Sequence, residues 1–248
     1  MSVPVPAVTT SIPRSGHGDE RSTIGALAVT SRPLDAYRDM FRLDDSDLTA
    51  GPILDCPAGA SPFGAQVRAL GGEVVSVDPA YAQPDGLIAR ARADLDRIVS
   101  WQHTNPTGFD WSYLGSPDRV RRWWGGGIEM FAGDFTLDGQ RYVAAALPVL
   151  PFPDRRFTTA VSGFLLFTYP ELFDFADHLD ALLELVRVTR ADVRVFPLHD
   201  TAGRPYPHLE LLRTHLHERG VDTELRATGC SYSPHPESNR MLVCRRAP

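Results

Sequence analysis

Two aspartates directly follow short apolar runs, and their types and spacing make them candidates for binding a ligand. Ile53-Leu54 precedes Asp55, and Val74–Val77 precedes Asp78. The loop 56–61 between them is built of small residues, which let a ligand approach the backbone closely. An acid that ends the second strand of such a unit, roughly 20 residues further on, can accept the hydroxyls of a ribose. The segment therefore predicts a site for an adenosine-containing ligand.

The residues between the two aspartates predict the helix that such a site needs. Ser61 suits the N-cap and Pro62 the first helical position. Phe63, Val67 and Leu70 then recur on one helix face, and a glycine pair ends the helix. The free N–H groups of its first turn face the loop. In a doubly wound sheet, ligands bind beyond the carboxyl ends of the strands, which is where both acids fall.

The loop after the first strand disfavours a dinucleotide. Dinucleotide sites prefer the pattern Gly-x-Gly-x-x-Gly, which lets a pyrophosphate rest on the helix start, and residues 55–61 lack it. The acid Asp55 at the start of the loop is unfavourable beside a pyrophosphate and favourable beside an ammonium group.

The remaining pattern alternates between strands and helices. Further strands are expected at 142–146, within 157–167, and at 193–196, 221–227 and 241–244, with helices through 172–186 and 209–219. We therefore expect an α/β fold, a doubly wound, Rossmann-like and mostly parallel sheet of seven strands with helices on both faces.

The domain organisation follows from composition and spacing. Residues 1–30 are rich in Pro, Ser, Thr and Gly and are expected to form a disordered tail. Residues 31–248 are expected to form a single domain. Within it, about 82–140 is too long for a simple connection after the second strand, and its patterning at 86–99 and 117–131 predicts a helical insertion.

Composition excludes several classes of function. The chain has 248 residues and a net charge of −6, and all 25 basic residues are arginine. Without lysine there is no Schiff-base enzyme, no Walker A loop and no protein-kinase site. The acidic charge disfavours a nucleic-acid partner. The histidines form no HxxxH or HExxH pattern and the three cysteines no CxxC pair, so we expect no metal.

Segments that direct a protein to a membrane or out of the cell are not evident. No run of about 18 apolar residues exists, and the first 30 residues lack a basic start followed by an apolar stretch. We expect a cytoplasmic monomer or homodimer, with a small-molecule substrate and without nucleic-acid or membrane partners.

Taken in order, these motifs resemble the class I S-adenosylmethionine-dependent methyltransferases of the small-molecule type. Residues 55–61 resemble the first motif of that family, and Val75–Pro79 resembles its ribose-binding motif. Leu150–Phe157 is similar to a Leu-Pro-Phe-x-Asp-x-x-Phe-Asp run, and Leu182–Arg190 to the helix before the fifth strand. The resemblance covers roughly residues 50–200, and it implies S-adenosylmethionine as cofactor.

Carried over position by position, the resemblance implies a set of cofactor-binding residues. Asp55 is expected near the methionine amino group and Asp78 at the ribose hydroxyls. The pair 146–147 is expected to flank the adenine, and 162–163 to face the sulfonium. The full set is Asp55, Pro57, Gly59, Ser61, Asp78, Pro79, Ala146, Leu147, Ser162 and Gly163.

Two departures from the family pattern suggest a second function. Pro57 and Ser61 stand where the family usually has glycine, and the run 144–146 is all alanine where many members place an acid for the adenine amino group. Adenine would then be held by backbone contacts and apolar packing. The alternative is therefore a non-methylating protein on the same scaffold, with a cofactor-binding regulatory, structural or cyclase-like role.

The acceptor end of such a site needs other residues. Some acceptors need a general base, and His199, just past the fifth strand, and Tyr169, just past the fourth, are the candidates. The alternative without a catalytic role is that both are polar residues of exposed loops. The tryptophans at 101, 111, 123 and 124 either shape an aromatic acceptor site or anchor the helical insertion. The arginines at 119, 121 and 122 either receive an acidic substrate or form a solvated helix face.

Overall fold

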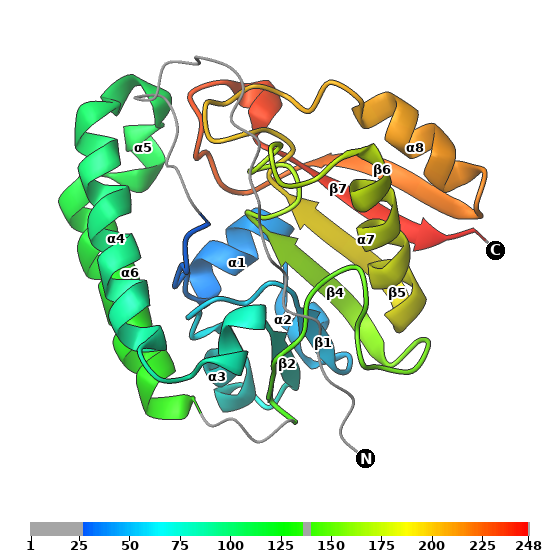
Figure 1. Cartoon of the computed structure of the whole chain (residues 1–248), viewed down its shortest axis with the longest axis horizontal. Helices are drawn as coiled ribbons and strands as arrows, with labels where there is room; N and C mark the ends of the chain where they lie inside the picture. Colours follow the sequence, from blue (N-terminus) through cyan, green and yellow to red (C-terminus); the bar gives the residue numbers. More distant parts are fainter. Residues whose placement is uncertain (1–26, 136–139, 248) are drawn as a thin grey trace.

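A seven-stranded sheet runs through the protein in the order β3-β2-β1-β4-β5-β7-β6. The computed structural model describes residues 27–135 and 140–247. Figure 1 shows the sheet with helices packed around it. The strands are β1 (Ile53–Asp55), β2 (Val74–Val77), β3 (Tyr142–Val143), β4 (Phe157–Gly163), β5 (Thr189–Phe196), β6 (Val221–Ala227) and β7 (Arg240–Arg246).

The sheet is mixed, because one strand runs against the others. β1 pairs in parallel with β2 and β4, and the pairs β2–β3 and β4–β5 are also parallel. β7 pairs antiparallel with both β5 and β6. The predicted α/β class and mostly parallel sheet are therefore confirmed, with an antiparallel strand near one edge. The strand order reverses between β1 and β4, and such a switch point opens a crevice beyond the carboxyl ends of the strands.

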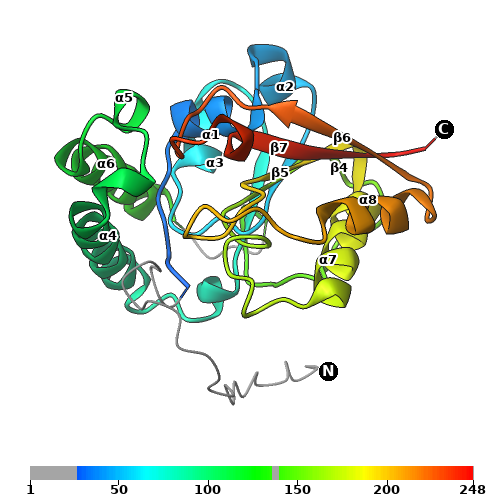
Figure 2. The same ribbon diagram turned by 90° about the horizontal axis from the view of Figure 1, so that it is seen from above.

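Helices cover both faces of the sheet. Figure 2 shows α7 and α8 on one face and α1, α2 and α3 on the other, with α4 and α6 side by side at one end. The helices are α1 (Leu34–Phe41), α2 (Asp45–Thr49), α3 (Phe63–Ala69), α4 (Leu87–Thr104), α5 (Trp111–Leu114), α6 (Pro117–Asp134), α7 (Phe175–Val188) and α8 (Leu209–His217). Short 3₁₀ turns lie at η1 (Pro79–Ala82), η2 (Pro106–Gly108) and η3 (Pro236–Ser238).

Two hydrophobic cores lie on opposite faces of the sheet. Successive side chains of a strand point to opposite faces, so Ile53 packs in the core with α1 and α3 while Leu54 packs in the core with α7. Val74 and Val75 divide in the same way. This alternation explains why the buried strands read as continuous apolar runs in the sequence.

Several element ends differ from the sequence expectation. The helix after β1 ends at Ala69 rather than on an apolar face that includes Leu70, whose exposed fraction is 52%. α7 begins at Phe175, so Leu172 lies outside it with 41% of its surface exposed. β3 ends at Val143 and not at residue 146.

The tail expected at residues 1–30 falls mostly outside the described residues. Its last four residues, 27–30, lie against the domain. Val29 is 6% exposed, and its N–H donates to Asp94 on α4 at 2.8 Å. The packed part of the chain therefore begins before the boundary expected near Ser31.

The segment between β2 and β3 is helical. Its long helices α4 and α6 pack together and are joined by ion pairs, Arg92 with Glu129 and Arg121 with Asp96. α6 also approaches the N-terminal segment closely, because a Cβ on Gly127 would lie 2.3 Å from the carbonyl oxygen of Ser31. No helix of the described residues is long and apolar enough to cross a lipid bilayer.

We expect the core between the sheet and α7 to carry a large part of the stability. Leu182→Ala removes a fully buried side chain of this core and should lower the free energy of unfolding by about 2–5 kcal/mol. Urea unfolding measures the change. Leu211→Ala, on the exposed side of α8, is the matched control and should change stability by less than about 0.5 kcal/mol. Equal losses in the two variants would contradict the assignment of this core.

Candidate functional site

A cleft of about 430 Å³ opens at the switch point, beyond the carboxyl ends of β1, β2 and β4. Its volume falls in the range of about 300–1,000 Å³ that is usual for small-molecule sites. The sequence-predicted residues that line the cleft are Pro57, Gly59, Asp78, Pro79, Ala146, Leu147 and Gly163. The structure thus brings together most of the predicted cofactor set from four separate segments of the chain.

Asp78 is the acid that the fold places in the cleft. One carboxylate oxygen accepts the backbone N–H of Gly59 at 2.9 Å, and the other accepts the N–H of Ala80 at 2.8 Å. Burial raises the pKa of Asp78, and the two N–H donors oppose that rise. A carboxylate has about four lone-pair positions, so two remain for hydroxyl donors of a ligand.

Gly59 brings the N-terminal segment against the loop after β1. It has a φ of +57°, and a Cβ there would lie 2.7 Å from the carbonyl oxygen of Thr30. That same carbonyl accepts the N–H of Ala60 at 2.8 Å. We call residues 27–32 the strap. Glycine is therefore required here both by the backbone angle and by the approach of the strap.

The strap is fixed at several further points. The Ser31 hydroxyl donates to the carbonyl of Trp124 on α6 at 2.8 Å, and the Ser61 hydroxyl donates to the carbonyl of Arg32 at 2.6 Å. The Ala28 N–H donates to the Tyr169 hydroxyl at 3.3 Å. The strap thus connects the loop after β1, the helix α6 and the loop after β4.

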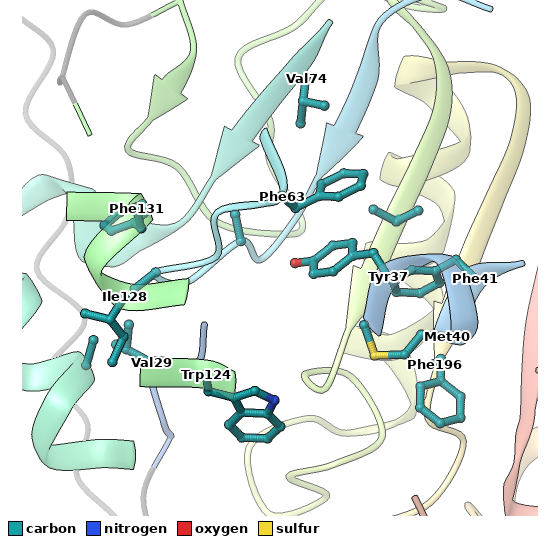
Figure 3. Packing of buried hydrophobic residues seen from close by; sticks show 14 of the residues in the cluster. Val29, Tyr37, Met40, Phe41, Phe63, Val74, Trp124, Ile128, Phe131 and Phe196 are labelled. Carbon is teal, nitrogen blue, oxygen red and sulfur yellow. The ribbon is translucent and has the colours of Figure 1, made fainter. Parts of the chain in front are cut away.

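Asp55 does not line the cleft. Its carboxylate is 1% exposed and accepts the hydroxyl of Tyr37 on α1, with oxygen–oxygen distances of 3.2 and 3.1 Å. Burial raises its pKa, and the Tyr37 hydroxyl only partly opposes this. Tyr37 stacks on Phe63 with ring centroids 4.2 Å apart (Figure 3). The structure therefore places Asp55 in a contact between β1 and α1, outside the residues that line the cleft.

Ser61 and Ser162 also lie outside the cleft lining. Ser61 caps the start of α3, because its hydroxyl oxygen accepts the Phe63 N–H at 3.1 Å while it donates to the strap. Ser162 is 1% exposed and its hydroxyl has no hydrogen-bond partner among the described residues. Its neighbour Gly163 does line the cleft.

A second cavity, of about 100 Å³, adjoins the cleft. We call it the aromatic cavity. Its wall is formed by the strap, α4, α6 and the loops that follow β4, β5 and β6, and its rings are Trp101, Phe109, Trp124, Phe164, Tyr169 and Tyr232. Ala28, Thr30 and Phe164 line both spaces. The two cavities therefore share a wall made by the strap and the end of β4.

Both predicted catalytic residues line the aromatic cavity. The Nδ1 atom of His199 lies 2.8 Å from the carbonyl oxygen of Asp200. A carbonyl only accepts, so this contact requires a proton on Nδ1 and leaves Nε2 as the unprotonated nitrogen. Nε2 is buried and has no partner among the described residues. Burial lowers the pKa of His199, so the ring is neutral at pH 7 and can accept a proton.

Tyr169 has a different role in the geometry. It is 5% exposed, and its oxygen accepts the Ala28 N–H of the strap. Burial raises its pKa, so the phenol keeps its proton. The contact makes Tyr169 an anchor of the strap, and the retained proton leaves the phenol able to donate a hydrogen bond. His199 is therefore the better base.

The four tryptophans divide between two roles. Trp101 and Trp124 line the aromatic cavity. Trp111 packs against Phe109 with ring centroids 5.4 Å apart, and Trp123 donates to Asp35 on α1 at 3.0 Å. The helical segment therefore both shapes the cavity and is anchored by its other tryptophans.

Sequence reasoning missed the strap and its basic residue. Arg32 is 8% exposed and lines the aromatic cavity. It lies next to the composition boundary near Ser31, but neither the period of the sequence nor its motifs mark it. Phe164 was missed as well, although its place at the end of β4 could have indicated a site residue.

Comparison with known proteins gives one sequence relative and a set of similar solved structures. No family model matches the chain. A protein of Methanocaldococcus jannaschii described as uncharacterized is 24% identical over 222 residues, which is 88% of this chain and 96% of that protein. The similar solved structures include S-adenosylmethionine-dependent methyltransferases.

Two of these solved structures show the level of similarity to this chain. A TehB-like methyltransferase of Corynebacterium glutamicum is 17% identical with a TM-score of 0.43, and the match covers 82% of this chain and 86% of that one. The CcbJ methyltransferase of Streptomyces caelestis is 12% identical with a TM-score of 0.44, covering 80% and 90%.

The part of the chain that the structure describes offers no other obvious chemistry. Within it, no three His, Cys, Asp or Glu side chains gather as metal ligands. Cys56, Cys230 and Cys244 are buried and unpaired, and burial raises the pKa of each thiol.

We expect Gly59→Ala to loosen the strap. Alanine at either Gly59 or Gly71 adopts a left-handed backbone at a cost of about 1–2 kcal/mol. Only at Gly59 would the new methyl group also meet Thr30, since nothing lies within 4 Å of a Cβ on Gly71. Limited proteolysis should therefore cut residues 27–32 faster in Gly59→Ala than in Gly71→Ala. Equal cutting would show that the loop does not hold the strap.

We expect His199 to titrate below its ordinary pKa of 6.5. Between its folded and unfolded pKa values the unfolded chain binds more protons, so its contribution to stability is full above about pH 6.5 and falls as the pH drops. NMR titration of the imidazole measures the folded value, and the resonance that is lost in His199→Gln assigns it. A midpoint at or above 6.5 would contradict the buried, neutral ring.

Proposed function

We propose that the protein is an S-adenosylmethionine-dependent methyltransferase that acts on a small-molecule acceptor. The observation that carries this proposal is the pair of adjoining cavities at the carboxyl edge of the sheet. The cleft is lined by most of the predicted cofactor-binding residues, and the aromatic cavity is lined by a neutral histidine whose Nε2 has no partner among the described residues. The shared wall would bring a cofactor and an acceptor next to each other, as group transfer requires.

The residues of the cleft fit the proposed cofactor. Asp78 keeps lone pairs for the ribose hydroxyls, and the small loop residues Pro57 and Gly59 leave room along the backbone. An apolar wall for an aromatic base is present in Ala145, Ala146, Leu147, Leu165 and Phe173. Such a wall suits a base that is held by packing and backbone contacts, as the alanine run predicts.

S-Adenosylmethionine, when bound, supplies a methyl group on a positively charged sulfur, so the protein needs no nucleophile of its own. The chain has to position the acceptor, exclude water and accept a proton. His199 Nε2 would take the proton of an acceptor hydroxyl or amine, because its Nδ1–H is held by the Asp200 carbonyl. Tyr169 would stay protonated and hold the strap over both cavities.

A second candidate is a protein that binds the cofactor and does not transfer the methyl group. The alanines at 144–146 motivate it, and so does the position of Asp55 outside the cleft. Incubation with a methyl-labelled donor and a cell extract separates the two. Binding of the donor without label transfer to any small molecule favours the second candidate.

We expect Asp78→Asn to weaken binding of S-adenosylhomocysteine, the demethylated product. The change removes a charged acceptor in the cleft and should cost about 1.5–3 kcal/mol, the scale for a hydrogen bond to a charged group. Isothermal titration calorimetry measures the affinity, and the unaltered chain should bind with a Kd below about 100 µM, or about −5.5 kcal/mol.

Asp85→Asn is the control for this prediction. It makes the same change of charge in an exposed residue of the segment after β2 and should leave the affinity unchanged. Absence of any binding of S-adenosylmethionine and S-adenosylhomocysteine to the unaltered chain would overturn the proposed function.

A further inference from the structure

Unpartnered polar atoms are concentrated around the aromatic cavity. Among the described residues, most buried side-chain nitrogens and oxygens without a hydrogen-bond partner belong to residues that line it. They include Nε of Arg32, Nε1 of Trp101 and Trp124, Oε1 of Gln102 and the hydroxyl of Tyr232. A buried polar group without a partner costs about 1–3 kcal/mol. Their concentration shows that many polar groups around this cavity are not satisfied by the described residues themselves.

Arg32 is the unusual member of this group, because it is a buried cation without an acid. Its guanidinium donates to the Thr30 hydroxyl at 2.8 Å, and within residues 27–135 and 140–247 it forms no ion pair. Buried arginines are normally paired. Arg194, for comparison, is 6% exposed and lies within 3.1 Å of both Asp47 and Asp192.

The acids near Arg32 are engaged elsewhere. Asp200, which also lines the cavity, accepts from the Arg204 guanidinium at 2.7 Å and from two backbone N–H groups. Asp35 accepts the indole N–H of Trp123. The described residues around the cavity therefore leave one positive charge uncompensated, and an anionic ligand would supply its partner.

Two rings limit where that anion can bind. The Arg32 guanidinium carbon lies 3.6 Å from the centroid of the Phe164 ring and 4.4 Å from that of the Trp124 ring. Stacked rings cover the faces of a guanidinium and leave the donors at its edge, where a carboxylate can bind through two hydrogen bonds. Nη1 already donates to Thr30, so the edge with the unpartnered Nε is the one that remains.

The shape and lining of the cavity suggest the rest of the ligand. The volume is about 100 Å³, which limits the ligand to a small molecule. Six aromatic side chains line the walls, and a flat ligand can stack against them. His199 lines the same space, and its unprotonated Nε2 has no partner among the described residues.

We propose that the aromatic cavity binds a single-ring aromatic carboxylate, with the carboxylate paired to Arg32, and that this molecule is the methyl acceptor. That the aromatic carboxylate is the methyl acceptor rests on the proposed function. That the cavity binds an aromatic carboxylate is inferred from the cavity alone. A ring hydroxyl or amino group would then be the atom within reach of His199.

Binding of small aromatic acids tests this assignment without any turnover. The probes are benzoate, the three hydroxybenzoates and 2-aminobenzoate, each compared with its primary amide. Calorimetry and the fluorescence of Trp101 and Trp124 follow the binding. At least one acid should bind with a Kd below about 1 mM, and its amide should bind at least about tenfold more weakly, or about 1.4 kcal/mol.

A pair of variants identifies the cation. Arg32→Gln should weaken binding of that acid at least about tenfold and leave its amide unaffected, because only the charge-assisted pair is lost. Arg122→Gln makes the same change of charge on the exposed face of α6 and should alter neither. Circular dichroism checks that the variants are folded. The comparison of acid with amide on the unaltered chain shows whether binding depends on the charge of the carboxylate.

Three results would overturn the inference. They are the absence of binding by every acid of the panel up to about 5 mM (about −3 kcal/mol), equal affinity for acids and amides, and an unchanged affinity in folded Arg32→Gln. S-Adenosylhomocysteine is titrated in the same samples. Binding of the acid without S-adenosylhomocysteine would remove the proposed function and keep the ligand class, whereas the reverse would remove only the present inference.

Discussion

The close approach between Gly59 and the carbonyl of Thr30 is the constraint on which both cavities depend. The loop after β1 can come this near only because it has no side chain at that position, and the Ala60 N–H then holds the strap in place. Once fixed, the strap forms one wall of the cleft with Thr30 and one wall of the aromatic cavity with Arg32. Gly59, which a motif search would assign to cofactor contact, therefore also positions the strap.

The layered fold could be predicted from the sequence because each strand and helix is marked by a pattern within a few neighbouring residues. The apolar runs at Ile53–Leu54 and Val74–Val77, each followed by an acid, are visible in a few residues and set β1 and β2. The residues at strand ends followed from the rule that ligands bind beyond the carboxyl edge. This rule predicted Asp78, and the family resemblance predicted Gly59 and Gly163; all three line the cleft.

The same reasoning failed where a side chain had a choice of partners. Asp55 and Asp78 look alike in the sequence, since both end a strand. Only the packing of α1 brings the Tyr37 hydroxyl to Asp55 and withdraws that acid from the cleft. Arg32 was missed for a related reason, because its cavity is formed by segments that are distant in the sequence. The arginines of α6, which the sequence offered for an acidic substrate, include Arg121 in an ion pair with Asp96 and Arg119 bonded to backbone carbonyls.

Buried charges thus have three different environments in this protein. Arg194 is neutralised by Asp47 and Asp192 and serves stability. Asp78 is held by backbone N–H groups that favour its charged form while it still lines a cavity. Arg32 has aromatic rings and one hydroxyl around it but no opposite charge. The charge of Arg194 is fully compensated by its two acids, whereas Asp78 and Arg32 can each still bind a polar group of a ligand.

The antiparallel strand β7 has a consequence for how the chain is assembled during synthesis. β7 follows β6 in the chain and yet lies between β5 and β6, and among the described residues β6 pairs with no other strand. When the ribosome has released only the first part of the chain, β5 is an open sheet edge and β6 cannot join it. The sheet is therefore completed only after β7 has been translated, and the edge of β5 stays open to other strands until then.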